Sequence, residues 1–162
     1  MAILEILVVG IVATACLDIG QQIYRLATGM PITDWGMIGR WAAYLPKGQV
    51  VHENIGKTPP VDGELALGWI VHYVVGIGYA VVYLLLMWFI LGIEPGFVPA
   101  MVFGALSVSV TWFVMEPILG AGVMAAKTPK PPAAMAHDFA IHLSFGFGLF
   151  LGIVISRSLF GG

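Results

Sequence analysis

The sequence is poor in charged residues. Asp, Glu, Lys and Arg together make up 10% of its 162 residues, whereas soluble domains contain ~25%. Seven Lys and Arg stand against nine Asp and Glu, which gives a formal net charge of −2. Nucleic-acid-binding domains carry a basic patch, so this composition excludes a nucleic-acid partner. With 59% hydrophobic residues, the chain is also too apolar to be disordered.

Cysteine and catalytic motifs are scarce as well. The single cysteine, Cys16, cannot form an intramolecular disulfide, which excludes a disulfide-stapled scaffold. The first residues contain no Lys or Arg, so the basic start of a secretory signal peptide is lacking. The sequence contains no Gly-rich phosphate loop, nucleophile elbow or HExxH motif. We therefore name no catalytic residue and no certain cofactor, and these absences favour a non-enzymatic role.

Long apolar segments dominate the chain instead. A helix that spans a membrane needs ~20 mostly apolar residues. Four segments qualify, at residues about 2–28, 64–91, 97–119 (or on to 126) and 133–160. No segment alternates apolar and polar residues as a membrane strand would. The sequence therefore predicts an all-α integral membrane protein, with a single four-helix transmembrane domain surrounded by lipid.

The connections between these spans differ in length. The first, residues 29–63, is long enough to contain a short capped helix over about 34–45, which Pro46 ends. Three aromatic residues in this helix favour a segment that lies in the membrane interface. The second connection, residues 92–96, is a short turn, and the third, residues 127–132, is too rich in proline to be helical.

Positive residues are distributed unevenly between the two sides of the predicted membrane protein. Only Arg157 lies on the side of the termini. Cytoplasmic loops of membrane proteins carry an excess of Lys and Arg. We therefore expect a bacterial inner-membrane protein with the first and third connections in the cytoplasm and both termini in the periplasm. The residues on the cytoplasmic side are Arg25, Arg40, Lys47, Lys57, Lys127 and Lys130.

Small residues recur every fourth position in the spans, which places them on one helix face. Membrane helices associate where small residues let their backbones approach closely. Most of these positions are expected to pack the four helices together. For Gly148 and Gly152 a second interpretation is open, in which this face of the last span packs against another chain instead of within the bundle. The expected packing residues are Gly10, Gly68, Gly76, Ser144, Gly148 and Gly152.

Four ionisable residues lie inside the predicted spans at similar depth: Asp18, His72, Glu116 and His142. A charge within the bilayer costs at least ~2.5–3.5 kcal/mol, so such residues usually mark a function. One interpretation is a metal or proton site, because imidazole and carboxylate ligands suit a divalent transition metal. The other is structural, with hydrogen-bonded pairs Asp18–His72 and Glu116–His142 that set the register of the bundle.

Further residues of the same chemistry lie toward the cytoplasmic side. His52 and Glu64 extend the candidate metal-binding set, and Glu64 is placed as a gate residue. His137 and Asp138, near the start of the last span, offer additional ligands. No tight ligand motif unites these positions, so the metal or proton site rests on residue type and depth.

Several short motifs are specific enough to suggest a family. They are GRW at 39–41, VHENI at 51–55, GE at 63–64, GWIVHY at 68–73, GAG at 120–122, KTPKP at 127–131 and the stretch 142–149. In these motifs the chain resembles a family of small bacterial membrane proteins catalogued as a domain of unknown function. The resemblance implies a four-helix inner-membrane protein and brings no activity, substrate or cofactor.

The sequence is compatible with two functions. The first is a non-catalytic interaction or accessory subunit of a larger membrane assembly, which packs on other chains or on itself. It would use either the small-residue face of the last span or the aromatic helix of the first connection. The alternative is the intramembrane metal or proton site, serving transport or a reaction on the cytoplasmic side. Four spans make a thin transport path, so a transporter would need a dimer.

Overall fold

The structure, a computed structural model, describes residues 3–161, and every regular element among them is helical. Four long helices form the bundle: α1 (Ile3–Thr28), α3 (Glu64–Leu85), α4 (Phe97–Val110) and α6 (Pro131–Phe160). With their continuations, four helical segments are long and apolar enough to cross a membrane. The predicted class, an all-α protein with four membrane-spanning helices, is confirmed.

The span boundaries differ slightly from the prediction. The expected start at Ala2 lies outside the described residues. The second span continues from α3 through a π-helical turn, Leu86–Leu91. The third runs from α4 through a second π-helical turn, Thr111–Met115, into α5 (Glu116–Leu119). It ends where Gly120 takes a left-handed conformation with φ 90°, so the extension to residue 126 is wrong.

The last span begins two residues earlier than expected. Pro131 and Pro132 are its first two residues, although the prolines of this connection were predicted to exclude a helix. Proline is tolerated there because the first helical turn has no partner for its N–H groups. The span therefore begins at Pro131, slightly before the expected start at about residue 133.

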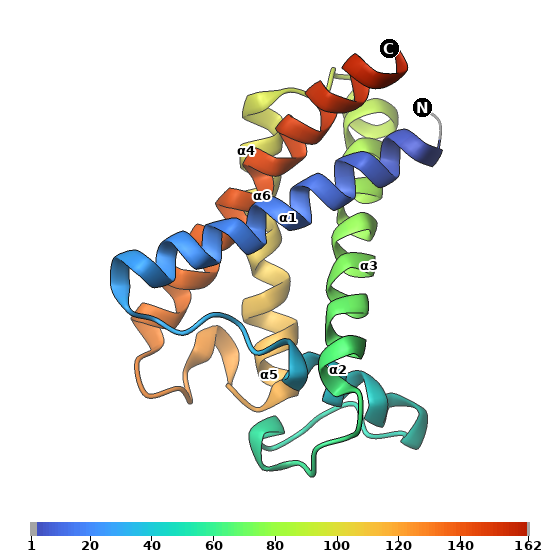
Figure 1. The fold of residues 1–162 in the computed structure, drawn as a ribbon. Coiled ribbons are helices and arrows are strands. Elements are labelled where there is room, and N and C mark those ends of the chain that lie inside the picture. Colours follow the sequence, from blue (N-terminus) through green and yellow to red (C-terminus); the bar gives the residue numbers. More distant parts are fainter. Residues whose placement is uncertain (1–2, 162) are drawn as a thin grey trace.

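Helices α1 and α6 lie side by side in contact along much of their length (Figure 1). A Cβ atom added to Gly148 would lie 2.6 Å from the Cα of Ala13, and one added to Gly152 would lie 2.7 Å from the Cα of Val9. Only glycine allows the two backbones to come this close. The alternative that this face meets another chain is wrong, because α1 of the same chain covers it.

The other small residues lie at further contacts within the bundle. A Cβ atom on Gly104 would lie 2.6 Å from the Cα of Gly146, where α4 meets α6. Gly10 approaches Ile77 equally closely, where α1 meets α3. Gly76 faces Thr14 across the same contact, and the hydroxyl of Ser144 lies against Gly20 between α6 and α1.

The short helix of the first connection is α2 (Trp35–Tyr44). The side chain of Asp34 caps it by accepting a hydrogen bond of 2.9 Å from the N–H of Gly36. Helix α2 packs directly on the first half of α3 (Figure 1). A Cβ atom on Gly39 would overlap the carbonyl oxygen of Glu64, and one on Gly68 would overlap the carbonyl oxygen of Trp35. This short helix is therefore part of the bundle and does not lie free of it.

The two ends of the bundle differ in character. We call one the loop face, formed by loop one (residues 29–63) and loop three (residues 120–130), and the other the terminal face, where α1 begins and α6 ends (Figure 1). The core toward the terminal face is apolar, whereas the buried histidines lie toward the loop face. The apolar core includes Val9, Ala13, Ala80, Tyr83, Leu84, Met87, Ala100, Leu149 and Ile153.

Candidate functional site

Asp18 and His72 form the contact that joins α1 to α3 inside the membrane-spanning region. Nε2 of His72 lies 3.0 Å from Oδ1 of Asp18. The hydroxyl of Tyr73 donates to Oδ2 of the same carboxylate at 3.1 Å, and the amide of Gln21 donates to Oδ1 at 3.1 Å. Three donors therefore serve one carboxylate, as a buried charge requires.

Helix α2 completes this Asp18 network from a third direction. The indole ring of Trp35 stacks on the imidazole of His72, with ring centroids 3.7 Å apart and planes inclined by 22°. The backbone N–H of Thr33 donates to the side-chain oxygen of Gln21 at 3.1 Å. Gln21, Tyr73 and Trp35 are not among the site residues predicted from the sequence. Helical spacing offered a signal for Gln21, which lies three residues after Asp18 on the same face.

A second polar cluster, which we call the acid pair, consists of Glu116 at the start of α5 and Asp138 on α6. Their carboxyl groups lie close enough to repel each other when both are charged. Nδ1 of His137 lies 3.4 Å from Oδ1 of Asp138. The other oxygen of Asp138, Oδ2, is buried and has no hydrogen-bond partner. Two carboxylates are both acceptors, so no hydrogen bond forms between them unless one holds a proton.

Loop three covers the acid pair in a strained conformation. The backbone N–H of Ala125 donates to Oε2 of Glu116. Met124 and Ala125 both have left-handed backbones, with φ 53° and 57°. Each such residue costs on the order of 1–3 kcal/mol and persists only where its surroundings hold it. The Glu116 carboxylate is one of the groups that hold this loop.

His142 has different partners from those expected. Its Nδ1 lies 2.8 Å from the hydroxyl of Ser107 and its Nε2 lies 3.1 Å from the hydroxyl of Thr111. The predicted pair Glu116–His142 is therefore wrong. The π-helical turn Thr111–Met115 inserts an extra residue into span three and rotates every later side chain away from a 3.6-residue ridge.

Glu64 forms an ion pair with Arg40. It is therefore not the free carboxylate that was predicted as a gate residue. The guanidinium of Arg40 binds both carboxylate oxygens, with N–O distances of 2.6 and 2.8 Å. It also donates to the carbonyl oxygens of Ile55 and Thr58 at 3.1 and 3.0 Å. The hydrogen bond to Glu64 raises the pKa of Arg40 further above its ordinary value. Arg40 thus clamps α2, loop one and the start of α3 together.

His52 belongs to loop one and lies apart from the histidines of the spans. Its backbone N–H donates to the carbonyl oxygen of Ile118 at 2.8 Å, and its Nδ1 contacts Gln49 and Thr58. Of the six predicted metal ligands, only Asp18 and His72 contact each other. Within residues 3–161, no group of three or more His, Cys, Asp or Glu side chains is placed to hold a metal ion.

Residues 7–156 match the model of the DUF2938 family, described as a protein of unknown function. The chain belongs to the DUF2938 family. The family resemblance that the sequence motifs suggested is confirmed. No curated protein and no solved structure matches the chain.

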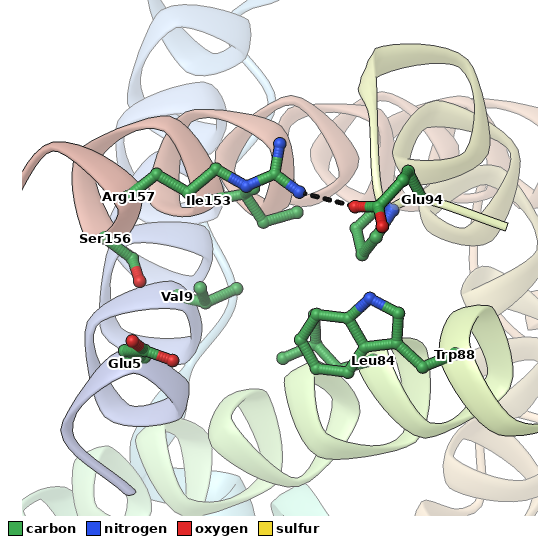
Figure 2. Close-up of a pocket in the computed structure, with 9 residues that line it drawn as sticks. Glu5, Val9, Leu84, Trp88, Glu94, Ile153, Ser156 and Arg157 are labelled. Atoms are coloured by element: carbon green, nitrogen blue, oxygen red, sulfur yellow. Dashed lines mark hydrogen bonds and ion pairs between the residues drawn. The ribbon is translucent and has the colours of Figure 1, made fainter. Parts of the chain in front are cut away.

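The described residues of this DUF2938 protein form a pocket at each end of the bundle. The pocket on the terminal face has a volume of about 290 Å³ (Figure 2). Its lining includes Trp88 and the ion pair between Arg157 and Glu94, whose N–O distance is 2.9 Å. The pocket on the loop face is larger, about 530 Å³, and lies between loops one and three.

Proposed function

We propose that this protein binds a proton at the acid pair and conducts protons across the membrane. The observation that carries the proposal is the placement of Glu116 and Asp138, two carboxyl groups that face each other within the membrane-spanning helices. Oδ2 of Asp138 is buried without a hydrogen-bond donor. A shared proton supplies that donor.

The physical reason is charge repulsion in a poorly polar medium. Two facing carboxylates repel each other, and a shared proton removes the repulsion while adding a hydrogen bond. The cost of an unpaired charge is larger inside the bilayer than at the surface. A pair of this kind takes up and releases one proton as a unit. That is the elementary event of proton conduction.

The location of the acid pair fits exchange with the loop face. Glu116 lies three residues before the end of span three at Leu119, roughly 5 Å along the helix axis at ~1.5 Å per residue. The core toward the terminal face is apolar. The proton would therefore enter from the loop face, and its release on the other side requires the apolar half to open or a second copy to complete the path.

The decisive experiment measures proton uptake and proton flux separately. Infrared spectra of the reconstituted protein should show a protonated carboxyl band at neutral pH that Asp138→Asn abolishes. Liposomes containing the protein should dissipate an imposed pH gradient at least tenfold faster than protein-free liposomes. Asp138→Asn and Glu116→Gln should both reduce that rate at least tenfold.

Glu94→Gln on the terminal face is the matched control, because Glu94 is exposed and pairs with Arg157 instead of a second carboxyl. It should leave the infrared band and the flux unchanged. A carboxyl band that survives in both acid-pair variants would place the proton elsewhere. Wild-type liposomes no faster than protein-free ones would refute transport.

For placement in the cell, we propose a bacterial inner membrane with the loop face in the cytoplasm. The support is the charge distribution, since six of the seven Lys and Arg residues lie toward the loop face and such an excess is typical of cytoplasmic loops. The hypothesis of an accessory subunit has lost one of its two docking surfaces, because α1 covers Gly148 and Gly152. The role itself stays a prediction.

A further inference from the structure

A polar pocket of about 530 Å³ on the loop face is built by two loops that are far apart in sequence. Gly120 of loop three has φ 90°, and a Cβ atom there would overlap the carbonyl oxygen of Glu53 in loop one. The hydrogen bond from the N–H of His52 to the carbonyl oxygen of Ile118 holds the same contact. The pocket is therefore a product of the docked loops and is separate from the acid pair.

The charge of the pocket lining is positive. Lys57 contributes from loop one and Lys127 from loop three, and Glu53 is the single carboxylate in the lining. Among the described residues, neither lysine has an ion-pair partner, and Glu53 has none either. Two unpaired lysines against one carboxylate favour an anion over a cation.

His52 supplies a buried polar atom beside these charges. The residue is only 3% exposed. Its Nδ1 lies 3.2 Å from the amide nitrogen of Gln49 and 2.9 Å from the hydroxyl of Thr58. Its Nε2 is buried and has no partner. A buried polar atom without a partner is rare in folded proteins, and it indicates a group that the described residues do not supply.

We propose that this pocket binds a phosphate group, carried either by a small soluble phosphate compound or by a phospholipid headgroup. Lysine is a common phosphate ligand, and the lining adds neutral donors from Gln49, Asn54 and Thr58. The volume is within the range of small-molecule sites. Neither Glu116 nor Asp138 lines the pocket, so the proposal stands whether or not the protein moves protons.

The first test is calorimetric titration of inorganic phosphate into the full chain in mild detergent, with chloride keeping the ionic strength constant. Wild-type protein should show saturable binding. The double substitution Lys57→Gln with Lys127→Gln should weaken it at least tenfold. Lys130→Gln is the matched control, because Lys130 lies in the same loop but does not line the pocket. Its affinity should equal that of the wild type.

Glu53→Gln gives an independent test with the opposite sign. Removing the only carboxylate of the lining should tighten phosphate binding several-fold, a result that general damage to the loops would not produce. If Glu53→Gln weakens binding, or if the double lysine variant binds like the wild type, the proposal is overturned.

The two sources of phosphate are separated by a second measurement. Native mass spectra are recorded after reconstitution in phosphatidylcholine vesicles with and without phosphatidylglycerol. Calorimetric binding of inorganic phosphate identifies a soluble ligand. Retention of one phosphatidylglycerol, lost in the double lysine variant, identifies a headgroup. If the wild type binds neither probe, the pocket is not a phosphate site.

Discussion

Asp18 accepts hydrogen bonds from three side chains, so its removal affects more than one contact. Asp18→Ala leaves the donors of His72, Tyr73 and Gln21 without their acceptor. An unsatisfied buried donor costs about 1–3 kcal/mol. Tyr73→Phe removes one bond only, and single hydrogen bonds between membrane helices average about 0.6 kcal/mol.

We therefore expect Asp18→Ala to lower the free energy of unfolding by about 1–3 kcal/mol and Tyr73→Phe by about 0.6 kcal/mol. The measurement is a titration from mild detergent into sodium dodecyl sulfate, followed by the helical circular dichroism signal. Equal losses for the two variants would show that the carboxylate does not organise the Asp18 network.

Arg40 shows why lysine does not replace arginine at a clamp. Its planar guanidinium binds both oxygens of Glu64 and two carbonyls of loop one, a geometry that a lysine ammonium cannot reproduce. Arg40→Lys keeps the charge but should free loop one and cost about 1 kcal/mol.

Limited proteolysis checks this expectation. Cleavage within residues 45–63 should become roughly fivefold faster in Arg40→Lys, since ~1.4 kcal/mol corresponds to a factor of ten. Arg25→Lys, which substitutes an arginine at the end of α1, should leave the rate unchanged. Faster cleavage in both variants would point to a general effect of the lysine substitution.

At the scale of elements, the packing of α2 on α3 depends on glycine at the crossing point. A methyl group on Gly68 would overlap the carbonyl oxygen of Trp35, which is backbone and cannot swing aside. Gly78 lies on the same helix α3, and a methyl group there meets no atom within 4 Å. The two positions form a matched pair.

Gly68→Ala should destabilise the protein by about 1–3 kcal/mol through overpacking. Gly78→Ala should be neutral or stabilise it by up to about 1 kcal/mol, because alanine is the better helix former. Thermal unfolding of both variants in the same detergent measures the difference. If Gly68→Ala unfolds at the same temperature as the wild type, α2 does not pack on α3 as described.

At the scale of the whole molecule, the two faces of the bundle carry different chemistry. Polar clusters and most positive residues lie toward the loop face, whereas the core toward the terminal face is apolar. From this asymmetry we expect the loops on one side of a membrane and the turn around Glu94 on the other. Arg157 pairs with Glu94, which confirms that α6 ends at the same face as this turn.

Cysteine labelling tests this arrangement. In a Cys16→Ala background, Lys47→Cys and Glu94→Cys should react with a membrane-impermeant maleimide from opposite sides of sealed vesicles, since both residues are exposed. Lys47→Cys should be protected in intact bacterial cells and Glu94→Cys should react there. Labelling of both from the same side would contradict a membrane crossing by residues Glu64–Leu91.

Much of the fold was predictable because hydropathy is a local property of the chain. Four apolar segments of spanning length are visible from composition alone, and the face of α3 that carries Gly68, His72, Gly76 and Ala80 follows from an unbroken helical period. These four residues are all buried. The Asp18–His72 pair could also be predicted from the sequence, because the depth and the chemistry of the two side chains were sufficient to suggest it.

Other features depend on contacts that no local pattern encodes. The π-helical turn Thr111–Met115 rotated Glu116 toward Asp138, and backbone register of this kind leaves no mark in composition. Gly148 and Gly152 of α6 face α1 instead of another chain. Small residues in a sequence indicate that another helix packs closely there, but they do not identify that helix. The chain by itself therefore determined the spans and their buried faces, and tertiary packing decided which polar groups meet.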